Sequence, residues 1–208
     1  MRNGFRFLAA RATAGAWLLA ITADAHAHSA AKGIGDFYSG ALHALTALEH
    51  VLPFLALGVL AGQQGQKAEP VLGVFCIALL VGAALAIWIP ALPYLAVLNI
   101  DSAIVLGGLV AIAKPLPAAI FYAIAVVFGL GHGFANGEGM SEGIKPYLFI
   151  PGVALAGLVV TAYGLIVTDW LLRRKAGWLH IAVRVAGSWI AAIGILVLAV
   201  SGRTLFAA

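Results

Sequence analysis

The chain has 208 residues, of which 63% are hydrophobic and only 10% are charged, and its mean hydropathy is +1.05. A soluble globular domain carries about 25% charged residues, so this composition excludes an ordinary soluble protein and favours one surrounded by lipid. The net charge of +4 does not indicate nucleic-acid binding, because the basic residues gather in the first eleven positions and between apolar runs.

The N-terminus is typical of a secretory signal peptide. Three arginines in the first eleven positions precede a short apolar run at 12–23, and an Ala-x-Ala sequence ends at Ala27. The apolar run is shorter than the roughly 20 residues that cross a bilayer. We therefore expect residues 1–27 to be cleaved, leaving His28 at the mature N-terminus and 28–208 as a single membrane domain. An uncleaved N-terminal anchor is the alternative.

Six apolar runs, separated by proline, glycine and charged residues, predict transmembrane helices. The chain contains 25 glycines, and small residues allow helix backbones to approach closely in a bilayer. We therefore expect an all-α integral membrane bundle of about six helices. The predicted spans are approximately 41–62, 71–89, 94–113, 117–135, 147–172 and 179–202.

The basic residues predict the orientation of the bundle. With the mature N-terminus outside, six basic residues fall on the inner side and three on the outer side, as the positive-inside rule requires. We expect a multi-pass protein of the bacterial inner membrane with a periplasmic N-terminus. The inner residues are Lys67, Lys114, Arg173, Arg174, Lys175 and Arg184, and the outer ones are Lys32, Lys145 and Arg203.

The first predicted span carries the most informative polar residues. Asp36, His43 and His50 are spaced by seven, which places them within about 20° on one stripe of a continuous helix. Thr46 falls between the two histidines on that stripe, and Glu49 points toward a different neighbour. Ionisable groups at membrane depth usually face the bundle interior and serve a function, so we expect this set to be functional.

A second polar stretch follows the fourth span. His132, Asn136, Glu138 and Glu142 are interspersed with glycines in residues 129–143. Glycine allows sharp turns, so this stretch predicts a compact loop at the outer end of the span that presents imidazole and carboxylate together. An ordinary polar loop is the alternative.

The third predicted span contains an acidic residue near its start. We expect Asp101 to face the same cavity as the histidines, with Asn99 and Ser102 as its hydrogen-bond partners. Cys76 stands alone in an apolar run, so we expect it to be a small buried hydrophobic residue.

Imidazoles with carboxylates and no thiolate favour reversible binding of a divalent transition metal. No His-Glu-x-x-His sequence occurs, which disfavours an intramembrane zinc hydrolase. Because neither polar stretch alone supplies enough ligands, we expect spans one and four to be neighbours, with His132 within about 10 Å of His43 or His50. The predicted metal site comprises His28, Asp36, His43, Glu49, His50, Asp101, His132, Asn136 and Glu138.

These two stretches resemble the signatures of a known family. Residues 40–50 are similar to the G-x-x-H-P-x-[ST]-G-x-D-H motif of the HupE/UreJ family, and residues 132–139 resemble its second motif, H-G-x-A-H-G-x-E. The resemblance implies a permease for Ni²⁺ or Co²⁺ that works with hydrogenase or urease maturation proteins. Taking this together with the distribution of basic residues and the missing His-Glu-x-x-His sequence, we expect a chain that is not an enzyme, has no tightly bound cofactor and does not bind nucleic acid.

The chain departs from both motifs. The loss of one imidazole leaves three outcomes open: a different metal, weaker binding, or loss of transport. Ala44 replaces the family proline, Ala47 the glycine, Glu49 the aspartate, Asn136 the second histidine and Gly139 the final glutamate, with Glu138 one place early.

The leading hypothesis is a secondary permease that carries nickel or cobalt from periplasm to cytoplasm. No Walker-type nucleotide motif is present in the sequence, so the ion gradient and membrane potential would drive transport. The alternative is a non-transporting accessory protein that binds metal or assists hydrogenase or urease assembly.

Overall fold

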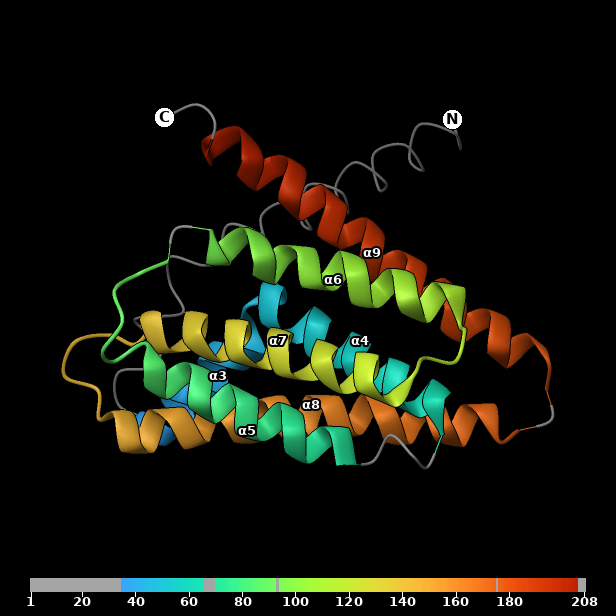
Figure 1. Cartoon of the computed structure of the whole chain (residues 1–208), viewed down its shortest axis with the longest axis horizontal. Coiled ribbons are helices and arrows are strands. Elements are labelled where there is room, and N and C mark those ends of the chain that lie inside the picture. The colour runs from blue at the N-terminus through green and yellow to red at the C-terminus, as the bar shows by residue number, and fades with distance from the viewer. Residues whose placement is uncertain (1–34, 66–69, 93, 175, 206–208) are drawn as a thin grey trace, which may run out of the picture.

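The structure is a computed structural model that describes residues 35–65, 70–92, 94–174 and 176–205, apart from the side chains of Ala96 and 201–205. The predicted signal peptide and His28 lie outside these residues. All regular elements of the described part are helices, which confirms the all-α class (Figure 1). They are α3 (Asp36–Thr46), α4 (Leu48–Gln64), α5 (Pro70–Leu85), α6 (Leu95–Ile112), α7 (Ala118–Glu138), α8 (Pro146–Leu172) and α9 (Trp178–Leu205).

Proline and glycine set the ends of several helices. Pro70 and Pro146 open α5 and α8, where the first N–H groups have no partner within the helix and the fixed φ of proline fits. Gly65 follows α4 with a φ of 77°, a conformation that side chains disfavour. The end of α4 and the starts of α5 and α8 therefore agree with the breakers seen in the sequence.

Only some of the helices satisfy the length expected of a membrane span. Among the described residues, α7, α8 and the Trp178–Val200 part of α9 are long and apolar enough to cross a membrane. The α3–α4 pair would make a fourth span, while α5 and Val97–Ile112 are shorter apolar helices. The chain is thus a helical membrane bundle, and the count of six spans stays a prediction.

The expectation of one continuous first span is wrong. The chain breaks at Ala47, whose backbone is extended, and the axes of α3 and α4 differ by 77°. The Thr46 hydroxyl bonds to the Leu42 carbonyl at 2.7 Å, and Pro53 removes one backbone hydrogen bond early in α4. Neither residue alone accounts for the position of the break. Its consequence is that His43 and His50 lie on different helices.

Close helix contacts depend on glycine, as the composition predicted. On α5, a Cβ added to Gly82 would overlap the carbonyl oxygen of Leu130 on α7. On α7, a Cβ at Gly133 would overlap the carbonyl oxygen of Leu79. The backbones of α5 and α7 are therefore in direct contact, the packing mode that favours association in lipid.

The glycine-rich loop expected over 129–143 is wrong for residues 129–138, which are helical, whereas 139–145 form the connection to α8. Helix α7 continues to Glu138, and Gly129, Gly133 and Gly137 lie against α5 rather than in turns. His132 and Asn136 are consequently one helical turn apart on a rigid element. Cys76 also differs from expectation, because it is only partly buried and its sulfur lies 4.0 Å from the carbonyl oxygen of Ala154.

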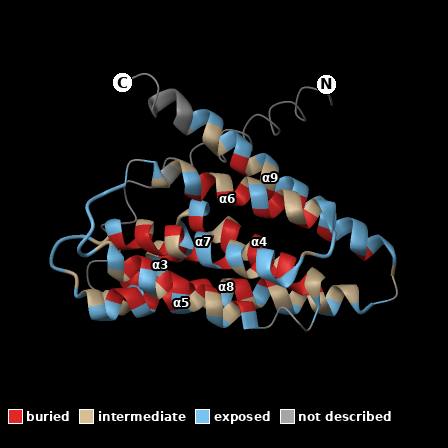
Figure 2. Cartoon of the chain, in the orientation of Figure 1, coloured by how far each residue is buried: buried red, intermediate tan, exposed pale blue. Residues whose placement is uncertain are grey.

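The buried residues gather where α4, α5, α7 and α8 meet (Figure 2). Large side chains fill this core, including Phe54, Phe75, Leu79 and Phe149. Helix α9 packs mainly on α6 at the edge of the bundle. Only 22% of an apolar 18-residue stretch of α9 is buried inside the protein. Its exposed apolar face is suited to contact with lipid.

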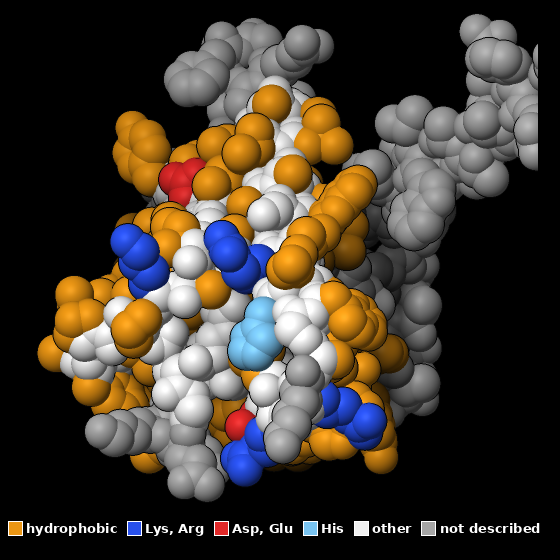
Figure 3. Space-filling view, turned by 90° about the vertical axis from the view of Figure 1, so that its right-hand side faces the viewer, with side chains coloured by type: hydrophobic (Ala, Val, Ile, Leu, Met, Phe, Trp, Pro, Cys, Tyr) orange, Lys and Arg blue, Asp and Glu red, His pale blue; other side chains and the backbone are white. Residues whose placement is uncertain are grey.

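One end of the bundle carries a group of basic side chains (Figure 3). This is the end at which α6 and α8 finish and α9 begins. The described basic residues of these segments are Lys114, Arg173, Arg174 and Arg184, all exposed. They are four of the six residues expected on the inner side, and their common position is consistent with that orientation.

Candidate functional site

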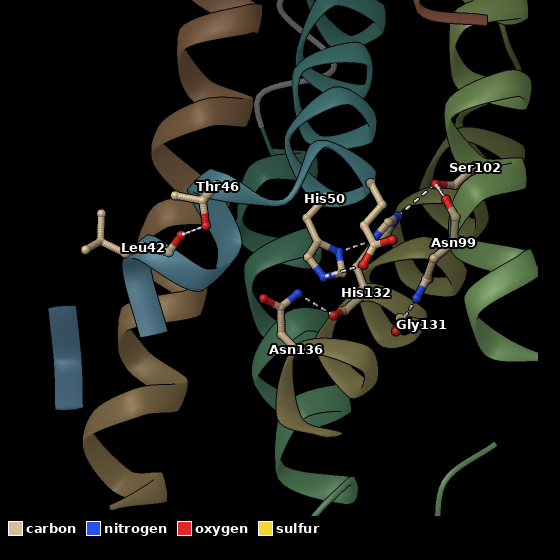
Figure 4. Close-up of polar contacts among 9 residues, drawn as sticks. Leu42, Thr46, His50, Asn99, Ser102, Gly131, His132 and Asn136 are labelled. Atoms are coloured by element: carbon tan, nitrogen blue, oxygen red, sulfur yellow. Dashed lines mark hydrogen bonds and ion pairs between the residues drawn. The ribbon is translucent and has the colours of Figure 1, made fainter. Parts of the chain in front are cut away.

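Two histidines from distant parts of the chain meet in the interior. His50 near the start of α4 is 2% exposed and His132 in α7 is fully buried. Their Nδ1 atoms are 2.9 Å apart, a hydrogen-bond distance, and the two rings are nearly perpendicular (Figure 4). The expectation that spans one and four bring these histidines within about 10 Å is therefore confirmed.

Helix α6 contributes the next contact of His132. The hydroxyl of Ser102, a fully buried residue, lies 2.8 Å from His132 Nε2 and 2.5 Å from the carbonyl oxygen of Asn99. The amide of Asn99 donates to the Gly131 carbonyl at 3.4 Å. Asn99 and Ser102 were expected to form hydrogen bonds with Asp101, but in the structure their side chains contact Gly131 and His132 of α7. Their signal in the sequence was a polar cluster within an apolar run.

The aromatic ring of Phe54 packs against both histidine rings. Its ring stacks on His50 with centroids 6.1 Å apart, and it meets His132 edge-on at 5.3 Å. Phe54 is itself 1% exposed. Sequence reasoning did not single it out, because one phenylalanine four residues after a histidine is unremarkable in an apolar helix. It limits the ring positions of both histidines.

Glu49 and His43 also lie close to His50. Glu49 Oε1 is 3.9 Å from His50 Nε2, and the Glu49 side chain is half exposed. The His43 ring is 6.1 Å from that of His50, measured between centroids. The break at Ala47 turns α3 so that His43 faces this group although it does not share a helix with His50. The Nε2 atom of His50 therefore faces a carboxylate, and a second imidazole lies near the ring.

Two buried amide oxygens accompany the histidines. Asn136 donates to the carbonyl of His132 at 2.7 Å, and its Oδ1 has no hydrogen-bond partner among the residues that the structure describes. The Oδ1 of Asn99 is likewise buried without a partner in the described part of the chain. Buried polar atoms are usually paired, so two orphaned acceptors next to His132 are unusual. Both are oxygen atoms that a water molecule or a cation would satisfy.

The remaining predicted site residues do not join the histidines. Asp36 accepts a hydrogen bond from the Lys145 backbone at 3.2 Å, and Glu138 accepts one from the Leu92 backbone at 3.2 Å. Thr46, expected between the histidines, is exposed and bonded within α3. Asp101 is partly buried on α6, but it is its neighbour Ser102 that contacts His132.

The donor set is small for a resident metal. Within the described ranges, no group of three or more His, Cys, Asp or Glu side chains is arranged to hold one metal ion. His50 and His132 face each other across a hydrogen bond, so their Nδ1 atoms are occupied by one another. The geometry is that of a polar cluster in which His50 Nε2 lies 3.9 Å from Glu49 Oε1 and the His43 ring lies nearby.

Comparison with known proteins places the chain in a family. The model of the family described as HupE / UreJ protein matches residues 16–197. Protein HupE of Rhizobium leguminosarum bv. viciae is 28% identical over 177 residues, covering 85% of this chain and 91% of that protein. No solved structure matches the chain. Because the family model spans nearly all of the sequence, including both polar stretches, the chain belongs to the HupE/UreJ family.

Proposed function

We propose that this protein is a secondary permease that carries a divalent transition metal, nickel or cobalt first, from periplasm to cytoplasm for metalloenzyme maturation. The family is associated with nickel accessory functions of hydrogenase and urease, which supports an accessory or transport role rather than an enzymatic one. The metal is cargo and not a resident cofactor.

The observation that carries the proposal is the position of Glu49 beside His50. Their Oε1 and Nε2 atoms are 3.9 Å apart. With metal–ligand bonds of about 2.0–2.2 Å, two ligands of one tetrahedral ion lie about 3.4 Å apart. A shift of about half an ångström would let both atoms bind one ion, and the neighbouring His43 ring could supply a third ligand after rotation.

A loosely assembled site is suited to transport. A permease must release its ion, so binding cannot be as strong as in a closed structural site. A dication moving inward gains about 4.6 kcal/mol from a potential of 100 mV, taking about 2.3 kcal/mol per charge.

The test is metal uptake into proteoliposomes with an imposed inside-negative potential, comparing Ni²⁺, Co²⁺, Cu²⁺ and Zn²⁺. We expect potential-dependent accumulation of Ni²⁺ or Co²⁺ above that of empty liposomes. The control variant is His180→Ala, which removes an exposed histidine of α9 outside the cluster and should transport normally. Saturable binding without accumulation would refute the permease and favour the non-transporting accessory protein.

A further inference from the structure

A buried chain of hydrogen bonds runs from the Asn99 carbonyl through Ser102 and His132 to His50. We propose that Ser102 fixes the tautomers of both histidines, so that Nε2 of His50 is the metal-binding nitrogen of the pair and His132 is a positioning residue. The tautomers follow from hydrogen counting, whereas the metal-binding role rests on the proposed function.

The first step is the direction of the Ser102 hydrogen bond. Its oxygen lies 2.5 Å from the Asn99 carbonyl oxygen, which can only accept. Two oxygens this close require a hydrogen between them, and the serine hydroxyl supplies the only one. Serine commonly bonds back to a carbonyl of the preceding helical turn. The Ser102 hydroxyl therefore donates its hydrogen to the Asn99 carbonyl and can only accept a hydrogen bond from a second neighbour.

The second step assigns His132. Its Nε2 is 2.8 Å from the Ser102 oxygen, so Nε2 must carry the hydrogen of that bond. A neutral imidazole has a hydrogen on one nitrogen and a lone pair on the other. The Nδ1 of a neutral His132 is consequently an acceptor.

The third step assigns His50. One hydrogen lies between the two Nδ1 atoms, which are 2.9 Å apart, and His132 does not supply it. A neutral His50 therefore carries its hydrogen on Nδ1 and its lone pair on Nε2. That lone pair lies 3.9 Å from the Glu49 carboxylate, an arrangement of two electron-pair donors that a cation would bridge.

The assignment changes the role expected of His132. Both of its nitrogens are engaged, one by Ser102 and one by His50, so it orients the His50 ring without contacting metal. Hydrogen bonds of this kind hold a ligating imidazole in the correct tautomer, and their loss typically lowers metal affinity by about 10–100-fold. Ser102, which no motif identified, acts on the metal through two histidines.

The tautomers can be measured without metal. We suggest ¹⁵N NMR of the full-length protein in detergent, labelled at the histidine ring nitrogens, with signals assigned through His50→Gln and His132→Gln. We expect hydrogen on Nε2 of His132 and on Nδ1 of His50. Hydrogen on Nε2 of His50, whether as the other tautomer or as a doubly protonated ring, would overturn the proposal.

Variants of Ser102 test its control of the pair. Ser102→Ala removes the acceptor of the His132 Nε2–H group, so the histidine tautomers should become mixed and Ni²⁺ affinity should fall about 10-fold or more. Ser102→Thr keeps a hydroxyl and should restore both readouts. The matched control is Thr161→Val, which removes another fully buried hydroxyl and should change neither. An unchanged histidine spectrum in Ser102→Ala would overturn the proposal.

The two proposals fail in different ways. If wild-type protein neither binds nor transports Ni²⁺ or Co²⁺, the proposed function is refuted, and the ring-nitrogen spectrum still decides the tautomers. If transport occurs but the spectrum shows the opposite tautomers, the permease stands and the roles given to Ser102 and His132 are refuted. Should Ser102→Thr fail to fold, the wild-type and Ser102→Ala spectra suffice for the decision.

Discussion

His50 and His132 share one hydrogen bond between their Nδ1 atoms at 2.9 Å, although 82 positions separate them in the chain. Both rings are buried, so each supplies the Nδ1 atom of the other with a hydrogen-bond partner in place of water. An interior histidine without such a partner leaves a polar nitrogen unsatisfied, which costs about 1–3 kcal/mol. The pair is therefore a unit in energetic as well as geometric terms.

We expect His50→Ala and His132→Ala to be non-additive in the free energy of unfolding in detergent. Each single change leaves the Nδ1 atom of the remaining histidine without its partner, whereas the double variant leaves no such atom. The loss of unfolding free energy in the double variant should therefore be smaller than the sum of the two single losses by about 0.5–3 kcal/mol. The control cycle combines His50→Ala with His180→Ala, which should be additive because His180 is exposed on α9. Additivity in both cycles would contradict the pairing.

Replacing His50 and Glu49 should separate a transport role from a structural one. We expect His50→Ala to abolish uptake per folded molecule, Glu49→Gln to impair it because the charge is removed, and Glu49→Asp to retain it. The measurement is Ni²⁺ uptake normalised to folded protein. If these residues only hold the bundle together, expression or thermal stability will fall while normalised uptake in His50→Ala and Glu49→Gln stays at the wild-type value.

Gly139→Ala should alter His43 without unfolding the protein. A Cβ at this position would lie 2.6 Å from His43 Nε2, so the ring has to move, and the φ of −72° at Gly139 accepts alanine without strain. We expect the free energy of unfolding to change by less than about 0.5 kcal/mol, and Ni²⁺ affinity to fall about 10-fold. Gly73→Ala, which meets open space, is the control. Unchanged affinity would show that the position of His43 is irrelevant to binding.

Gly82→Ala should destabilise the contact between α5 and α7. The new methyl group would overlap the Leu130 carbonyl, and overpacking of this kind costs about 1–3 kcal/mol. Gly108→Ala on α6 meets nothing within 4 Å, so it should be neutral or stabilise by up to about 1 kcal/mol through helix propensity. Thermal unfolding in detergent compares the two. Equal effects would mean that glycine is not required for the α5–α7 contact.

The mature protein should begin at or near His28. The short apolar run at 12–23 and the Ala-x-Ala sequence ending at Ala27 motivate this prediction, which lies outside the described residues. N-terminal sequencing of protein purified from membranes provides the measurement. Recovery of Met1 or Arg2 at the N-terminus would identify an uncleaved anchor instead.

The sequence by itself determined the class of protein and most of its helices. Long apolar runs have no stable alternative to helix in lipid, so composition and breakers such as Pro70 and Pro146 were sufficient. The two motifs also identified His43, His50 and His132, because ionisable groups are rare at membrane depth. These inferences depend on local chemistry, which a single chain displays directly.

The tertiary structure decided how those residues meet. The prediction from the seven-residue spacing required one continuous helix. The chain instead breaks at Ala47, and His43 and His50 come close to each other from two different helices. Ser102 was recognisable as polar, but only the packing of α6 beside α7 directs its hydroxyl to His132. A hydrogen bond between distant residues depends on how helices pack, and helix packing is set by many small contacts that no local pattern records.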